Sequence, residues 1–185
     1  MKKQEQTQRL ILNIESKDSA KQVLDFYLAN KRDFEKVEPT RPINFYTLAY
    51  HSLTLSMEEA EILNKKHLRY HIYLKEQPEE IIGTLCFSNI RKAPFYSATL
   101  GYKIDKRYRR LGIAKEAIAF CLNKMKSEYG LHRIECRVLP DNVASIALLR
   151  SLGFFEEGIE REGVEIDGTL RDHLRFAKLL NEKEV

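Results

Sequence analysis

The sequence predicts one α/β domain in which helices cover both faces of a mixed central sheet. Helical periodicity marks the early part of the chain, strand-like runs mark the later part, and a strand–helix–strand unit lies in the middle. Such a crossover connects parallel strands. A length of 185 residues, with 43% hydrophobic and 31% charged residues, is typical of a single globular domain. We therefore expect residues 1–185 to form one domain.

The early part of the chain predicts one strand and two helices. Residues 10–14 alternate weakly between apolar and polar side chains, as a first strand does. Two prolines break the chain further on, and Met57 is predicted to begin a second helix with Ser56 as its cap. N-terminal to the prolines, residues 16–19 offer capping groups for a first helix. Its apolar positions follow the helical period: Val23, Leu24, Tyr27 and Leu28.

Strands are predicted from residue 71 onward. Residues 71–74 and 81–87 are apolar runs separated by a polar turn, and the second run is almost continuously apolar, as in a strand covered on both faces. Residues 98–104 alternate as a third strand. An amphipathic helix then follows, and its apolar positions are Ile113, Ala117, Ile118, Cys121, Leu122 and Met125.

The last part of the chain returns to strands. Gly130 ends the amphipathic helix, and residues 134–138 alternate as a strand. A short helix is predicted over residues 143–152. Two more strands follow, and Asp167-Gly168 between them is a two-residue hairpin signal.

Composition narrows the class of protein. The N-terminal stretch lacks the apolar region of a signal peptide and no later run is long enough to span a membrane, so we expect a cytoplasmic protein without membrane contact. The net charge of +4 is modest and does not by itself indicate nucleic-acid binding. Three scattered cysteines predict reduced, buried thiols, with a catalytic thiol as the alternative. The five histidines show no metal-ligand spacing.

The densest basic cluster, residues 103–110, leads directly into the amphipathic helix. Arg109-Arg110-Leu111-Gly112-Ile113-Ala114 places small residues at alternate positions of the helix start, where backbone amides lack intrahelical partners. That arrangement suits a diphosphate, aided by the helix dipole. The alternative is a solvated basic loop with a simple turn glycine. No Gly-Lys-Ser/Thr follows, so a nucleotide-hydrolysing phosphate loop is excluded.

Arg109-x-x-Gly112-x-Ala114, after a strand ending in residues 101–105, resembles the acyl-CoA signature of the GNAT N-acetyltransferase superfamily. A second block, residues 141–154, resembles the second cofactor-side motif of that family. The resemblance extends over about residues 10–180. Asn142-x-x-Ser145 and Arg171-Asp172-His173 look most like the bacterial enzymes that acetylate N-terminal α-amino groups of ribosomal proteins.

The resemblance implies acetyl-CoA as cosubstrate, no metal, and direct attack of an amine on the thioester in a ternary complex. It implies that the pantetheine arm pairs with the backbone of the third predicted strand, where an N–H polarises the thioester carbonyl. Asn142 is expected to bind the pantetheine amides or to cap the following helix. The cofactor residues are then Tyr102, Lys103, Ile104, Arg109, Arg110, Leu111, Gly112, Ile113, Ala114 and Asn142.

The catalytic groups are less well defined by the resemblance. Ser145 is expected to donate a hydrogen bond to the departing thiolate, or else to satisfy local backbone groups. Many relatives carry a tyrosine where Leu149 stands and a glutamate where Thr99 stands, so the usual acid and base are absent. Glu157 and Glu160 lie where the resemblance places the acceptor cleft and are candidate bases; the alternatives are that they are solvated surface charges and that a base acts through water.

Three alternatives stay open at this point. Within the enzyme class, the acceptor is a protein N-terminus or a small amine such as an antibiotic or a polyamine. From other classes, the chain is a non-catalytic acyl-CoA-binding module, or the basic cluster binds nucleic acid, which we do not expect because few aromatic residues accompany it. The protein is expected to be a monomer or a homodimer.

Overall fold

The structure is a computed structural model that describes residues 3–180, and within them eight strands form one sheet in the order β1-β2-β3-β4-β5-β6-β8-β7. Neighbouring strands pair antiparallel except β5 and β6, which are parallel. The elements are β1 (Gln4–Gln6), β2 (Leu10–Asn13), η1 (Lys17–Ser19), α1 (Ala20–Phe34), α2 (Leu48–Leu63), β3 (Leu68–Leu74), β4 (Gly83–Arg91), β5 (Ser97–Ile104), η2 (Lys106–Tyr108), α3 (Ile113–Ser127), β6 (Arg133–Val138), α4 (Val143–Ser151), β7 (Phe155–Ile166) and β8 (Thr169–Leu179).

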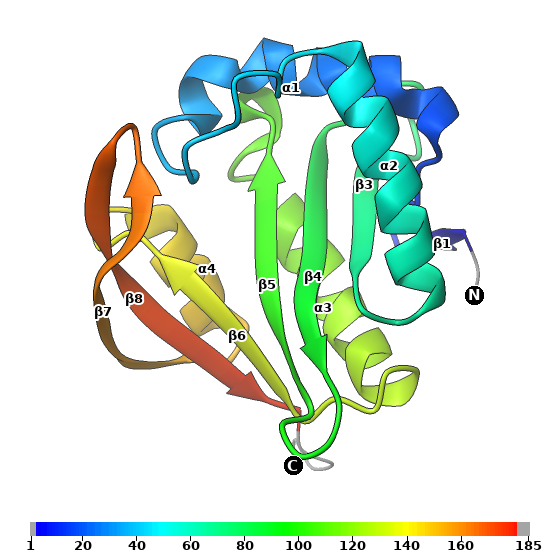
Figure 1. Cartoon of the computed structure of the whole chain (residues 1–185). Coiled ribbons are helices and arrows are strands. Elements are labelled where there is room, and N and C mark those ends of the chain that lie inside the picture. Colours follow the sequence, from blue (N-terminus) through cyan, green and yellow to red (C-terminus); the bar gives the residue numbers. More distant parts are fainter. Residues whose placement is uncertain (1–2, 181–185) are drawn as a thin grey trace.

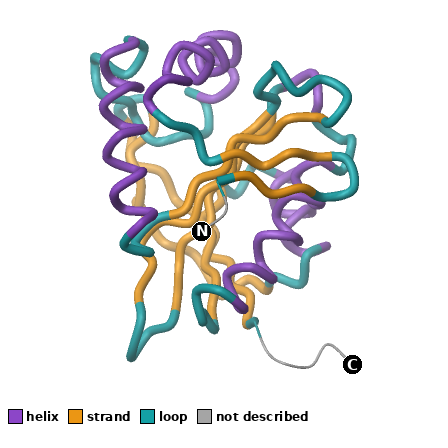
Figure 2. The backbone as a smooth tube through the Cα atoms, turned by 90° about the vertical axis from the view of Figure 1, so that its right-hand side faces the viewer, coloured by secondary structure: helices purple, strands orange, loops and turns teal. Residues whose placement is uncertain are grey.

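Helices cover both faces of this sheet, as the sequence predicts. Figure 1 shows α1 and α2 on one face and α3 and α4 behind the other, and Figure 2 shows the same layers from the side. The alternation of side chains along β3 supplies both layers. Ile72 belongs to the main core beneath α3, whereas Tyr73 belongs to a second cluster beneath α1 and α2.

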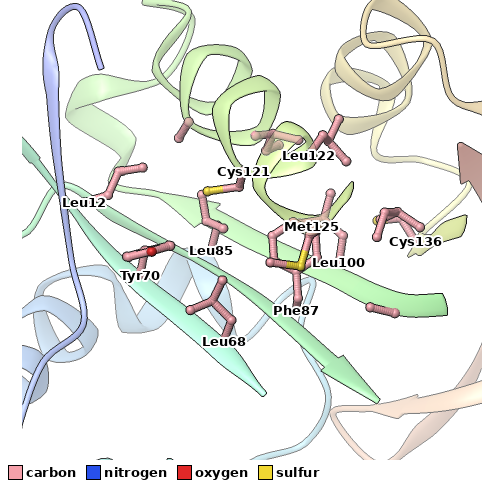
Figure 3. Close-up of a cluster of buried hydrophobic side chains, with 14 of the residues drawn as sticks. Leu12, Leu68, Tyr70, Leu85, Phe87, Leu100, Cys121, Leu122, Met125 and Cys136 are labelled. Carbon is pink, nitrogen blue, oxygen red and sulfur yellow. The ribbon is translucent and has the colours of Figure 1, made fainter. Parts of the chain in front are cut away.

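The main core lies between α3 and the sheet (Figure 3). All six apolar positions predicted for α3 are buried, and Ala117, Ile118, Cys121 and Met125 are fully inaccessible. β4 is buried on both faces at its start, as its nearly continuous apolar run predicts. This packing fixes where α3 begins relative to β5, which matters for the site described below.

The second cluster joins α1 to the loop before α2 through aromatic rings. The Tyr27 ring packs edge-on against Phe45 at 5.0 Å between centroids and against Phe34 at 6.2 Å. Edge-to-face pairs of this kind contribute roughly 0.5–1.5 kcal/mol beyond their burial. The cluster anchors α1 and α2 over the sheet.

The predicted start of the second helix is wrong by about two turns. α2 begins at Leu48, and Thr47 is its cap, because the Thr47 Oγ1 accepts a hydrogen bond from the Tyr50 N–H at 3.2 Å. Ser56, the predicted cap, lies inside the helix, where its hydroxyl donates to the Ser52 carbonyl at 3.0 Å. Burial of one helix face outweighs the weak helix propensity of this segment.

The strands differ from the prediction mainly at their ends. β1 was not predicted, β3 begins at Leu68 instead of residue 71, and β4 continues to Arg91. The Asp167-Gly168 hairpin is confirmed, because both residues have positive φ (+49° and +72°), as a type I′ turn requires. Among residues 3–180, no helix is both long enough and apolar enough to cross a membrane.

Candidate functional site

The site is organised by the separation of β5 from β6. The two strands pair at only three positions, and the last is Thr99 opposite Glu135. Beyond it, β5 stays paired with β4 as far as Ile104, and β6 stays paired with β8 as far as Val138. Each strand is therefore held on its outer side while the inner sides part, which Figure 1 shows as a widening gap between the two arrows.

An interrupted parallel pair leaves backbone amides and carbonyls on the inner side of β5 without a neighbouring strand. Buried backbone groups need hydrogen-bond partners, so an extended ligand that carries its own amides fits this edge chemically. The edge includes Tyr102, Lys103 and Ile104, the three residues for which the sequence predicts backbone pairing with a cofactor arm.

The loop that follows β5 ends at the N-terminus of α3. Gly112 is the helix cap and has φ +76°, a conformation that favours glycine. The first helical bond runs from the Glu116 N–H to the Gly112 carbonyl at 3.0 Å. The amides of Ile113, Ala114 and Lys115 precede it, so they are available to an anion, and the positive end of the helix dipole favours one there.

The N-terminal strands brace this loop. The Arg9 guanidinium donates to the Leu111 carbonyl at 3.0 Å and pairs with Glu116 on the first turn of α3 at 2.7 Å. Glu116 also accepts from the Thr7 hydroxyl at 2.6 Å and from the Arg9 backbone N–H at 2.8 Å. Burial opposes ionisation of this carboxyl, but these bonds hold the pKa of Glu116 below its ordinary value.

The other end of the loop is fixed by Asp105. This residue is buried and accepts hydrogen bonds from the Asn30 side chain at 3.0 Å and from the Arg107 backbone N–H at 2.9 Å. Although burial opposes ionisation, the bonds from Arg107 and Asn30 hold the pKa of Asp105 at about 2. Helix α1 is thereby tied to the end of β5.

Part of the basic cluster is paired with neighbouring acids. Lys103 extends toward α1, where it pairs with Glu38 and lies 5.1 Å from the centre of the Tyr27 ring. Arg107 pairs with Asp105 and with Glu80. These two cations of the cluster therefore have acidic partners within the protein.

Two of the predicted cofactor-side residues form a polar contact across the gap. Asn142 caps α4, since its Oδ1 accepts from the Ser145 N–H at 3.2 Å. The Ser145 hydroxyl lies 2.6 Å from the Tyr102 hydroxyl, which comes from β5. Burial raises the pKa of Tyr102, so its phenol is protonated at neutral pH. The structure thus brings together Tyr102, Asn142 and Ser145, although sequence gives no sign of the contact between the two hydroxyls.

Glu157 and Glu160, the predicted bases, both form ion pairs with β6. The Arg133 guanidinium forks onto Glu157, and Arg137 Nε donates to Glu160 at 2.6 Å. The hydrogen bond from Arg133 holds the pKa of Glu157 below its ordinary value. Leu149 is fully buried in the main core, so it packs instead of contributing chemistry.

A cleft of about 880 Å³ opens beside the last β5–β6 pair, on the face that carries α2. Its floor includes Thr99 and Glu135, and one wall includes Lys66 and His67 at the end of α2. The cleft therefore lies on the face of the sheet opposite α3, at the point where β5 and β6 begin to part.

Two of the three cysteines, Cys121 and Cys136, are buried as predicted, whereas Cys86 is half-buried. Cys86, Cys121 and Cys136 are free thiols, and burial raises the pKa of Cys136 to about 12. In the part of the chain that the structure describes, no group of three or more His, Cys, Asp or Glu side chains could hold a metal ion.

Comparison with known proteins agrees with this architecture. A model of the acetyltransferase (GNAT) family matches residues 28–154. The chain is 30% identical over 172 residues to the ribosomal protein uS5-alanine N-acetyltransferase of Escherichia coli K12, which covers 92% of this chain and 88% of that protein. It is 29% identical over 160 residues to the probable N-acetyltransferase YjcK of Bacillus subtilis, covering 86% and 88%.

Among solved structures, Mycobacterium smegmatis RimJ in complex with CoA-disulfide superposes with a TM-score of 0.88 at 29% identity, covering 95% of this chain and 84% of that one. The chain belongs to the acetyltransferase (GNAT) family. It is an N-acetyltransferase.

The brace on the loop makes a pH-dependent prediction. Because the folded pKa of Glu116 is below its unfolded value, its ionised form stabilises the fold at neutral pH, and this contribution is lost as pH falls through the folded pKa. The difference in unfolding free energy between wild type and Glu116→Gln should be largest near pH 7 and should shrink between about pH 5 and pH 3. Urea unfolding measures it.

Glu59→Gln is the matched control, since Glu59 forms a more exposed pair with Lys3 and should shift stability only slightly. A Glu116→Gln difference that stays constant with pH would contradict the assignment of that ion pair.

Proposed function

We propose that this protein transfers an acetyl group from acetyl-CoA to the N-terminal α-amino group of a ribosomal protein. The observation that carries the proposal is the gap between β5 and β6. The start of α3 lies on one face of the sheet, and the cleft beside the last β5–β6 pair opens on the other face. Ribosomal-protein acceptors would place its work in the cytoplasm.

The donor side follows from the chemistry of CoA. Its diphosphate is an anion for the amides at the start of α3, flanked by Arg109 and Arg110, and its pantetheine arm carries two amides for the inner edge of β5. Gly112 leaves room for the diphosphate. Support comes from M. smegmatis RimJ, a relative of the same fold solved with a CoA derivative.

The acceptor side fits an amine that needs little deprotonation. An α-amino group has a pKa near ~8, whereas a lysine amine is near ~10.4, so an N-terminus is already partly neutral at physiological pH. Glu157 and Glu160 remain candidate bases, each paired with an arginine of β6. The acceptor of the E. coli relative is ribosomal protein uS5, by its name.

Departure of the CoA thiolate needs a proton donor. We assign this role to Ser145 acting with Tyr102, because the two hydroxyls lie 2.6 Å apart at the gap. The phenol here comes from Tyr102 of β5. Position 149 of α4 holds a leucine, which packs in the main core. A protonated phenol can pass a proton to sulfur through the serine hydroxyl.

The direct test is a panel of acceptors assayed with acetyl-CoA for thiol release and for acetylated product. Peptides that begin with Ala, Ser or Met should be acetylated in preference to polyamines and aminoglycosides. Preference for polyamines or aminoglycosides would show that the acceptor is a small amine and not a protein N-terminus. Saturable acetyl-CoA binding with no transfer to any amine would favour the non-catalytic module.

The proton-donor assignment predicts non-additive losses. Tyr102→Phe and Ser145→Ala should each lower kcat by about 10- to 100-fold, within the range of general acid catalysis, and the double variant should be little worse than either one. Tyr108→Phe is the matched control, since that hydroxyl contacts Gln77 and Glu80 away from the gap. Multiplicative losses in the double variant would show that the two hydroxyls act independently.

A further inference from the structure

A carboxylate stands directly opposite the position where one is missing from β5. The resemblance to the GNAT family implies a glutamate where Thr99 stands, and the sheet register pairs Thr99 with Glu135 of the neighbouring strand. Neighbouring residues of paired strands that share a face lie within contact distance of one another. Sequence reasoning did not find Glu135, because α3 and two turns separate the two residues along the chain.

The Glu135 side chain points into the cleft. Its neighbours Ile134 and Cys136 are buried in the main core on the α3 side, so alternation along β6 turns Glu135 to the opposite face. There it lines the cleft of about 880 Å³ together with Thr99. Its side chain is 26% exposed, which leaves the carboxylate open to a ligand in the cleft.

Cations surround Glu135 without closing it off: Arg133 and Arg91 contact it, and the cleft lining also includes Lys66, Arg137 and Arg175, with Glu61 as the other acid. Arg133 donates to Oε1 through Nε at 2.8 Å, and its terminal nitrogens are both engaged by Glu157. The guanidinium of Arg91 is 3.8 Å from Oε2. One oxygen of Glu135 is therefore fixed, and the other has only a distant partner.

Glu157 and Glu160 are placed less favourably for the same task. Glu157 uses both oxygens on the fork of Arg133, and neither glutamate belongs to the lining of the cleft. Both lie on β7, the edge strand beyond β8, whereas Glu135 lies at the point where β5 and β6 part.

We propose that the cleft above the last β5–β6 pair receives the acceptor, and that Glu135 binds its ammonium group and takes its proton. This rests on the proposed acetyl transfer. The ammonium loses one proton to the Glu135 carboxylate, the neutral nitrogen bonds to the thioester carbonyl carbon, and the carbon–sulfur bond then breaks. The sulfur gains a proton from the Tyr102–Ser145 pair. The second proton of the nitrogen, lost after the attack, reprotonates this pair, and Glu135 releases its own proton to water.

The test is Glu135→Gln in the peptide assay. At pH 7 the variant should lose about 100-fold in kcat, a loss typical of a removed general base. The loss should shrink as pH rises above ~8, because the α-amino group is then neutral without help. Glu156→Gln is the matched control: Glu156 pairs with Arg150, outside the cleft, and its loss should leave the rate unchanged.

A rescue experiment separates chemistry from folding. Thr99→Glu in the Glu135→Gln background returns a carboxylate to the paired position. The kcat of this double variant should be at least about tenfold higher than that of Glu135→Gln alone. Stabilisation by acetyl-CoA, measured as a thermal shift, should be the same in wild type and in Glu135→Gln, because Glu135 faces away from the donor side. An unaltered shift also shows that the variant is folded.

Two outcomes would overturn the assignment while leaving the proposed function intact. One is a wild-type rate in Glu135→Gln. The other is a pH-independent loss without rescue by Thr99→Glu, accompanied by a larger loss in Glu157→Gln or Glu160→Gln. Absence of transfer by the wild-type protein would instead refute the proposed function itself.

Discussion

β5 and β6 share three register pairs and then separate, and the rest of the site depends on this separation. Each strand is held by its outer neighbour, β4 on one side and β8 on the other, so neither can bend back to close the gap. A sheet interrupted in this way leaves backbone groups of half-buried residues on the inner edge of β5 without a neighbouring strand. Such groups are costly to bury unless a ligand completes their hydrogen bonds.

Binding at the gap requires that the start of α3 and the cleft are both held in place relative to β5 and β6. On one side, α3 is fixed by its packing on the main core and by the bonds from Arg9 to Leu111 and Glu116. On the other side, the aromatic cluster holds α1 and α2 over the sheet and leaves the cleft between α2 and β6. In the proposed reaction, donor and acceptor would approach the same point from opposite faces of the sheet.

The sequence predicted the parts of this design that depend on local pattern. The period of α3, the glycine at 112 and the Asp167-Gly168 hairpin are all signals contained within a few residues, and the structure confirms each. The predicted start of α2 was wrong because burial of His51 and Leu55 on one face of the helix outweighs the weak propensity of its first turns.

The contacts between distant segments could not be predicted in this way. Arg9 and Glu116 are 107 residues apart, and Tyr102 and Ser145 are 43 residues apart. Whether Glu135 stands opposite Thr99 depends on the register of two strands joined by a helix, and a shift of one residue would turn it into the core. These contacts follow from tertiary packing, which the pattern of a single segment does not encode.

The central claim is that acetyl-CoA occupies the gap between β5 and β6 and the start of α3. Hydrogen exchange of backbone amides, measured with and without acetyl-CoA, tests it most directly. We predict slowed exchange confined mainly to residues 100–104 and 110–116, and no slowing in Gly112→Glu, where a charged side chain occupies the diphosphate position. Protection that falls on other segments, with these two unchanged, would contradict the account.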